Sequence, residues 1–161
     1  MNPEIIAKAV RGSTVESIHR GHLIAIDGNG DTVFSVGDPS TITYFRSAAK
    51  AFQAIPFITS GGADTYGYTE QEIALAVASH SGEPMHVRIA AGMLAKAGLT
   101  ESDLRCGAHR PFDEAESLRL SATGEQPSQL HNNCSGKHAA MLAFAKHIGD
   151  DTGSYDSTNH R

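Results

Sequence analysis

The chain has 161 residues, 40% of them hydrophobic and 19% charged, which is enough for one folded domain with a core and excludes a disordered protein. Its formal net charge of -5 and its scattered lysines and arginines argue against a nucleic-acid partner. The longest apolar runs, such as residues 73–78, fall far short of the ~20 residues of a membrane-spanning helix, and the charged start lacks a secretory signal, so we expect a cytoplasmic protein with no membrane partner.

Two short apolar, β-branched runs open the predicted secondary structure. They cover residues 22–26 and 32–36, and the turn between them, residues 27–31, is rich in Gly, Asn and Asp, which tolerate positive φ. This pattern predicts an antiparallel hairpin. Glycine and proline follow at residues 37–39, and a third strand-like segment, residues 42–45, leads to the first predicted helix.

Four helices are predicted after the hairpin. The first starts at Ser47, where apolar residues take a helical spacing, and Pro56 should kink or end it. The second, residues 69–78, opens with a Thr–Glu capping box. The third begins near Pro84 and ends at Gly98, and the last covers residues 137–148 before Gly149.

A strand pair followed by several helices predicts an α+β fold rather than alternating parallel βαβ units. We assign residues 1–149 to one folded unit, because no repeat or low-complexity tract interrupts them. Residues 150–161 are almost entirely polar, and we expect them to form a poorly ordered tail.

The sharpest chemical signal is a Ser-x-x-Lys motif at the start of the first predicted helix. A spacing of three places Ser47 and Lys50 on one helical face, about one turn apart, so that the amine can reach the hydroxyl. A desolvated lysine can accept the proton of a serine and make it a nucleophile. The motif alone also fits an exposed helix start, because serine and lysine are common residues.

The loop between the second and third helices carries two hydroxyls and an imidazole. Ser79 and His80 precede a predicted helix N-terminus, where such groups can bind an anionic group or relay a proton. Helix capping by serine explains the same residues.

The densest polar cluster covers residues 131–138. Cys134 could give a thiolate to a metal ion, and Lys137 or His138 could add a nitrogen donor one turn further on. A zinc site needs four donors, so this set is incomplete, and a solvated helix start is the alternative. Cys106 and Cys134 are the only cysteines, without a paired spacing, which favours reduced thiols over a disulfide.

Five segments, taken together, resemble the Rhizobium-type L-asparaginases, the asparaginase II family, in order and approximate spacing. They are Val10–Ser17, Phe45–Lys50, Ser79–Pro84, Cys106–His109 and Asn132–Ala139. The resemblance implies a fold similar to the serine β-lactamases and penicillin-binding proteins, and hydrolysis of L-asparagine to aspartate and ammonia. Ser47 and Lys50 match the first Ser-Lys tandem of the family, and Ser79 matches the serine of the second.

The same resemblance assigns the remaining candidate residues. Cys134 and Lys137 match two protein ligands of a zinc ion beside the substrate pocket, while Arg46 and His138 match polar residues close to that pocket. With His80, these two form our predicted substrate-binding set. The chain lacks the threonine-centred motifs of the bacterial type I and type II asparaginases.

One departure from the family is length. Family members are longer, and the lysine of the second tandem and a further cysteine ligand would follow Arg161, so the chain resembles a truncated, incomplete member. We expect the full domain to form a homodimer. Two other hypotheses stay open: a related serine hydrolase acting on another amide, against which the lack of Lys-Thr-Gly and Ser-Asp-Asn triplets argues, and an inactive fragment or interaction module.

Overall fold

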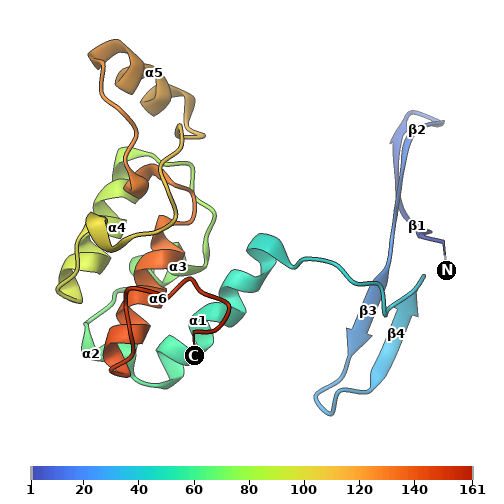
Figure 1. Cartoon of the computed structure of the whole chain (residues 1–161). Helices are drawn as coiled ribbons and strands as arrows, with labels where there is room; N and C mark the ends of the chain where they lie inside the picture. The colour runs from blue at the N-terminus through green and yellow to red at the C-terminus, as the bar shows by residue number, and fades with distance from the viewer. Residues whose placement is uncertain (1, 161) are drawn as a thin grey trace. The chain divides into compact units, whose positions relative to one another are not determined.

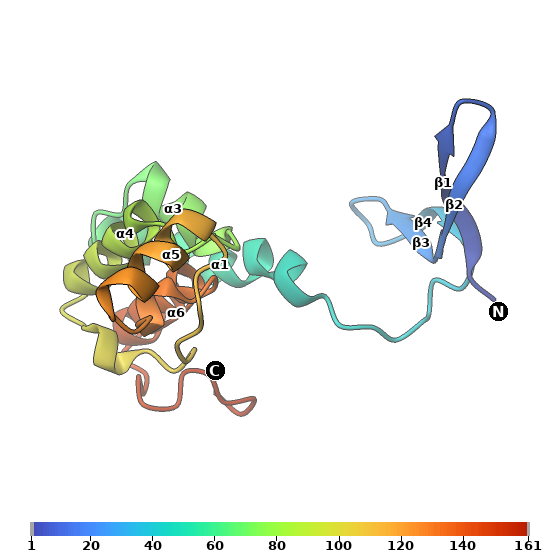
Figure 2. The ribbon, with the colours of Figure 1, turned by 90° about the horizontal axis from the view of Figure 1, so that it is seen from above.

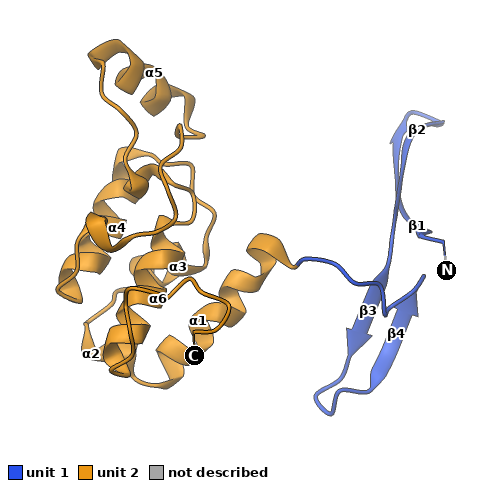
Figure 3. Cartoon of the chain, viewed as in Figure 1, with its two compact units in different colours: residues 1–44 blue, residues 45–161 orange. Residues whose placement is uncertain are grey.

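The computed structural model describes residues 2–160 and divides into two compact units, residues 1–44 and 45–161 (Figures 1 and 3). The first unit holds all the strands and the second all the helices. The α+β expectation, with an antiparallel hairpin followed by helices, is therefore confirmed. The boundary between the two units follows Tyr44, and the division expected after residue 149 stays a prediction.

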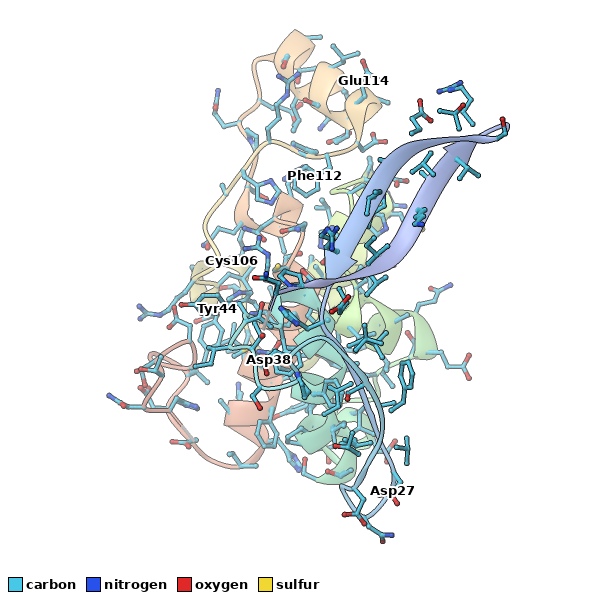
Figure 4. The ribbon with its side chains drawn as sticks, turned by 90° about the vertical axis from the view of Figure 1, so that its right-hand side faces the viewer. Asp27, Asp38, Tyr44, Cys106, Phe112 and Glu114 are labelled. Atoms are coloured by element: carbon cyan, nitrogen blue, oxygen red, sulfur yellow. The ribbon has the colours of Figure 1, made fainter. Side chains whose placement is uncertain are left out.

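The N-terminal unit consists of two antiparallel hairpins. Strands β1 (Glu4–Arg11) and β2 (Thr14–Gly21) pair in one two-stranded sheet, and β3 (Leu23–Ile26) and β4 (Thr32–Val36) pair in another. The second hairpin is the predicted one. Its turn is fixed by Asp27, whose carboxylate accepts the backbone N–H groups of Asn29 and Asp31 at 2.9 Å each (Figure 4).

Each sheet of this unit has two strands, and within the unit neither sheet forms a buried core over the described residues. No residue in the described range 2–44 is buried, and apolar side chains such as Val10, Ile26 and Val33 are more than half exposed. The segment 42–45 is not a strand, contrary to prediction, and Ile42 is 99% exposed. The apolar pattern there meets no neighbouring strand or core, which is what a strand needs in order to form.

The C-terminal unit is built from six α-helices and three short 3₁₀ turns within the described residues. The helices are α1 (Lys50–Thr59), α2 (Gly62–Thr65), α3 (Glu70–Val77), α4 (Pro84–Lys96), α5 (Glu114–Thr123) and α6 (Ser135–His147). The 3₁₀ turns are Arg46–Ala49, Glu101–Asp103 and Gln129–His131. None of these helices is both long and apolar enough to cross a membrane.

Helix α6 lies at the centre of this unit, with α1, α3 and α4 packed around it (Figures 1 and 2). It can lie there because its sequence is rich in small residues, and Ala139, Ala143 and Ser135 are fully buried. Larger side chains from α4 and α6, among them Met93 and Leu142, fill the remaining core at 0% exposure. The core therefore holds α6, and the loop before it, in a fixed position.

The helix boundaries follow the signals in the sequence, with one correction. Thr69 and Glu72 form a reciprocal capping box at the start of α3, and Pro84 is the first residue of α4. Pro56, however, lies inside α1, which continues to Thr59, so the predicted end at Pro56 is wrong and the alternative, a kink, stays a prediction. Proline removes one backbone hydrogen bond, which the flanking turns of this helix tolerate.

The polar C-terminal segment packs against the helical unit over its described residues, 150–160. Tyr155 is only 3% exposed and belongs to the same hydrophobic cluster as the helices. Asp151 closes the local turn by accepting Gly153 N–H at 2.9 Å and the Ser154 hydroxyl at 2.6 Å. One aromatic residue is thus enough to anchor a segment whose composition predicted a loose tail.

Candidate active site

Lys50 is the most unusual residue of the helical unit, because a lysine is rarely buried and this one is 3% exposed. Its Nζ donates to the Ala78 carbonyl at 2.6 Å and to the Asn133 carbonyl at 3.4 Å, and it lies 2.8 Å from Ser79 Oγ. One side chain from the start of α1 thereby joins the end of α3 to the loop before α6. The buried amine is fully satisfied by oxygen atoms, as a buried polar group must be.

Ser47 lies one turn earlier, in the 3₁₀ turn that precedes α1. It lines a pocket of about 280 Å³ together with Lys50 and four further residues, namely Arg46, Gln53, Cys134 and Lys137. Within residues 2–160, no hydrogen bond joins Ser47 Oγ to the Lys50 amine, which points into the core toward Ser79 instead. The pocket therefore gathers five of the eight predicted site residues, and the sixth, Ser79, contacts it through Lys50.

Arg46 precedes Ser47 with a φ of +49°, the only positive φ of a non-glycine residue in the described chain. A residue with a Cβ pays a steric penalty there, and such strain often accompanies functional sites. The turn brings the exposed guanidinium to the rim of the same pocket. Arg46, Lys50 and Lys137 give this lining three basic side chains, and it contains no carboxylate.

His80 is buried and both of its ring nitrogens are bonded. Nδ1 accepts the Gly82 N–H at 3.2 Å, so Nε2 carries the proton and donates to Ser135 Oγ at 2.9 Å. Ser135 in turn donates to the Leu130 carbonyl at 2.9 Å. Burial, with smaller contributions from His86 and Lys50, lowers the pKa of His80 to about 4, so the ring is neutral.

Through these two bonds His80 braces α6 against the 79–82 loop, and its predicted contact with substrate stays a prediction. Ser79 does not cap α4, because its hydroxyl bonds the Lys50 amine instead. His86, on α4, stacks on His80 with ring centroids 5.0 Å apart.

Asn132 and His109, neither of which is among the predicted site residues, hold the loop before α6. Asn132 is buried, and its amide donates to the carbonyls of Cys106 and Gly107, while its oxygen accepts the Cys134 N–H at 2.8 Å. His109 accepts the Asn133 N–H at 3.1 Å.

The ring of His109 is held in place by an aromatic neighbour, Phe112. Phe112 stacks on its ring in the segment that leads to Glu114 and α5 (Figure 4). These contacts position the Asn133 backbone, whose carbonyl accepts a hydrogen bond from the Lys50 amine. Asn132 and His109 lie inside segments that carried the resemblance, and Asn132 also belongs to the polar cluster of residues 131–138.

Cys134 and Lys137 both line the pocket, one turn apart at the start of α6. Burial lowers the pKa of Lys137, which favours the neutral amine that a metal ligand must be. Two donors do not fit zinc, which takes at least three protein ligands, and no group of three or more His, Cys, Asp or Glu residues clusters for a metal within the described residues. The Cys106 thiol donates to the Gln129 carbonyl at 3.6 Å.

His138, the residue after Lys137, pairs with Tyr155. The Tyr155 hydroxyl lies 2.8 Å from His138 Nδ1 and accepts the Arg105 N–H at 2.8 Å. Burial lowers the pKa of His138 to about 4 and raises that of Tyr155 to about 12, so both groups are neutral near pH 7. His138 does not line the pocket of Ser47, although it follows a residue that does.

A family model described as L-asparaginase II matches residues 7–161 of the chain, which includes the whole pocket. No curated protein matches the chain.

Proposed function

The chain belongs to the L-asparaginase II family, and from this membership we propose that it hydrolyses the side-chain amide of L-asparagine, giving L-aspartate and ammonia. The family suggests a hydrolase acting on amides with asparagine as its small-molecule substrate. We further propose that the complete domain has the fold class of the serine β-lactamases and penicillin-binding proteins. The catalytic residues in this proposal are Ser47, Lys50 and Ser79.

The observation that carries this proposal is the set of partners around the Lys50 amine. Two of them, the carbonyls of Ala78 and Asn133, can only accept a hydrogen bond, whereas the third, the Ser79 hydroxyl, can accept or donate a hydrogen bond. An ammonium group would donate to all three. A neutral amine would donate to the two carbonyls and offer its lone pair to the Ser79 O–H. The site thus accommodates both protonation states that a general base must adopt.

In the proposed reaction, neutral Lys50 takes the proton of Ser47, with the Ser79 hydroxyl available to pass it. The Ser47 oxygen attacks the side-chain amide carbon of asparagine and forms a bond to it, and the carbon–nitrogen bond breaks after Lys50 returns the proton to the leaving nitrogen. Ammonia leaves an acyl enzyme. Water then attacks the ester carbon while its proton passes to the amine, the bond from that carbon to the Ser47 oxygen breaks, and the amine returns the proton to Ser47 as aspartate leaves.

Substrate binding is proposed for the basic rim of the pocket. The guanidinium of Arg46 suits the α-carboxylate of asparagine, because a planar fork of N–H donors matches a carboxylate. His138 is proposed to add a neutral donor, and the geometry gives His80 a supporting place behind Ser135. Cys134 and Lys137 would hold zinc only with donors from beyond the described residues, and no step depends on the ion.

Ammonia release from L-asparagine by the purified chain tests the proposal. We expect Ser47→Ala to lose at least about a thousandfold in kcat, as removal of a nucleophile does. Ser79→Ala should lose roughly a hundredfold, the usual contribution of a proton-transfer group. Ser102→Ala is the matched control, since this exposed serine lies in the Glu101–Asp103 turn, away from the pocket, and should leave the rate unchanged.

The outcomes separate the competing hypotheses. Full activity in Ser47→Ala with loss in Ser79→Ala would make Ser79, already bonded to Lys50, the nucleophile. Release of product from another linear amide but not from asparagine would favour a related serine hydrolase. A folded wild-type chain that releases no ammonia would favour the inactive interaction module.

A further inference from the structure

His109 joins the segment before α5 to the loop before α6. Its Nδ1 lies 2.7 Å from the carbonyl oxygen of Arg110, and its Nε2 lies 3.1 Å from the backbone nitrogen of Asn133. The residue is half-buried, and Phe112 stacks on its ring with centroids 5.1 Å apart. Both ring nitrogens therefore face backbone groups, and a ring that turned over would lose both bonds.

The two backbone partners decide which ring nitrogen carries the hydrogen. A carbonyl oxygen can only accept a hydrogen bond, and a backbone N–H can only donate one. Nδ1 of His109 therefore donates to the Arg110 carbonyl, and Nε2 accepts the N–H of Asn133, which is the Nδ1–H tautomer of a neutral ring. Asn133 Oδ1 also lies 3.4 Å from Nε2, but this oxygen has the Cys134 thiol as its donor.

The carbonyl of Asn133 faces the proposed base. It accepts the Lys50 amine at 3.4 Å and the backbone N–H of His80 at 3.2 Å. Residue 133 thus lies between the imidazole of His109 on one side and the amine on the other. A shift of this residue would move one of the oxygen atoms that hold Lys50, and the Ala78 carbonyl, at 2.6 Å, would remain as its backbone partner.

We propose that His109 is a positioning residue, whose Nε2 lone pair holds Asn133 where the carbonyl of that residue directs the Lys50 amine toward Ser79. This inference rests on the proposed function, because Lys50 is the base of that reaction. His109 is not part of the pocket lining, so it acts on the reaction through Asn133. A misplacement of about 1 Å in a catalytic group can cost on the order of a hundredfold in rate, so a bond at one remove from the amine is enough to matter.

Two substitutions separate this bond from the other contacts of the ring. The amide of glutamine reaches about as far as Nε2, so His109→Gln keeps an acceptor for the Asn133 N–H. The shorter amide of asparagine reaches about as far as Nδ1, so His109→Asn keeps a donor for the Arg110 carbonyl and loses that acceptor. We expect kcat to fall at least about tenfold in His109→Asn and less than about threefold in His109→Gln, with KM changed less than about twofold in both. Equal values of kcat in the two variants would overturn the proposal.

His147→Asn is the matched control. His147 Nε2 lies 3.1 Å from the Ser60 carbonyl, and its ring meets that of Tyr66 edge to face, so this histidine also joins two segments through one ring. Its replacement should lower the urea midpoint about as much as His109→Asn does and leave kcat unchanged. An equal fall of kcat in both asparagine variants would assign the effect to lost stability and sink the proposal.

NMR tests the geometry whether or not the chain releases ammonia. In the ¹⁵N-labelled wild type at about pH 8, above the ordinary titration range of histidine, His109 should show a protonated Nδ1 and an unprotonated Nε2. Its signals are assigned among the nine histidines by their loss in His109→Gln. The Lys50 amine signal, assigned by its Overhauser contacts to Ala78 and Ser79, should shift in His109→Asn and stay in place in His109→Gln.

The spectra keep the two proposals apart. A protonated Nε2 on His109 in the wild type, or a Lys50 signal that His109→Asn does not move, would overturn the positioning role whatever the kinetics show. The expected spectra from a chain that releases no ammonia would reject the proposed function and support His109 as the residue that positions the amine.

Discussion

Gly136 is the residue whose replacement tests the packing of the site most sharply. It is the second residue of α6, and a Cβ built on it would lie 2.5 Å from the Leu75 carbonyl oxygen and 2.9 Å from the Leu75 carbonyl carbon. Ordinary contacts begin near 3.4 Å, so α6 and the end of α3 would have to separate by 3.4 minus 2.5, or 0.9 Å. Backbone atoms cannot rotate away as a side chain can, and the helices must move.

The expected cost follows from two opposing effects. Overpacking in a core costs about 1–3 kcal/mol, and a clash with backbone belongs at the upper end of that range. Alanine in a helix regains about 0.5–1 kcal/mol relative to glycine. We therefore expect Gly136→Ala to lower the free energy of unfolding by about 2 kcal/mol and Tm by roughly 4–8 °C.

Gly92→Ala provides the matched control in the interior of α4. The nearest atom to a Cβ there is Glu72 Oε1 at 3.9 Å, so this variant should gain about 0.5–1 kcal/mol. Thermal and urea unfolding of the two variants measure the difference. A Gly136→Ala chain as stable as Gly92→Ala would refute the close approach of α6 to α3. The displacement should also lower ammonia release well below Tm, because Ser135 and Lys137 flank the substituted residue.

Two further predictions concern stability. His80 has a folded-state pKa of about 4 against about 6.5 unfolded, so the unfolded chain binds the proton more readily. The stability that the neutral His80 ring contributes is complete above about pH 6.5 and is lost as the pH falls toward 4. The urea midpoint should therefore fall between about pH 6.5 and pH 4, and less steeply in His80→Gln than in the wild type. An equal slope in the two chains would refute this prediction. Leu142→Ala should cost about 2–5 kcal/mol because the side chain is fully buried, whereas Leu118→Ala, 57% exposed, should change stability by less than ~0.5 kcal/mol in the same assay.

Elements with local signals were predictable from the sequence. The capping box at Thr69 and the proline at position 84 marked the starts of α3 and α4, and the Gly-rich turn at 27–31 marked the hairpin. Helix α5 was missed because it is mostly polar, and of its two leucines Leu118 is exposed. Its capping aspartate, Asp113, which accepts the Glu116 N–H at 2.7 Å, was the available signal.

The first hairpin was missed for a different reason. Strands β1 and β2 pair with two register shifts, one between Ile5 and Ala7 and one between Ala9 and Val10, so their apolar residues do not alternate regularly. A period-2 search cannot find such strands. Tyr155 shows a related limit, since a single aromatic residue in a polar tail carries no periodic pattern, and its burial depends on tertiary contacts with Arg105 and His138.

The candidate site illustrates what local spacing can and cannot give. Ser47 and Lys50 line one pocket, since only two residues of chain separate them, but among the described residues the amine does not bond the Ser47 hydroxyl that the Ser-x-x-Lys spacing predicted it could reach. The spacing could not indicate that the amine reaches the Ala78 carbonyl and Ser79, 28 and 29 residues away, because this contact depends on how α1 packs beside α3.

These long-range contacts give Lys50 two inseparable roles. The amine that would remove a proton from serine also satisfies two buried carbonyl groups and joins three segments of the helical unit. Replacing Lys50 would leave the Ala78 carbonyl without this partner at a cost of about 1–3 kcal/mol, so lost activity would not distinguish chemistry from folding. Ser79→Ala removes only the hydroxyl and leaves both carbonyl contacts in place. The chemical role of the amine is therefore tested by ammonia release in the serine variants. Its structural role is tested by the free energy of unfolding of a lysine variant.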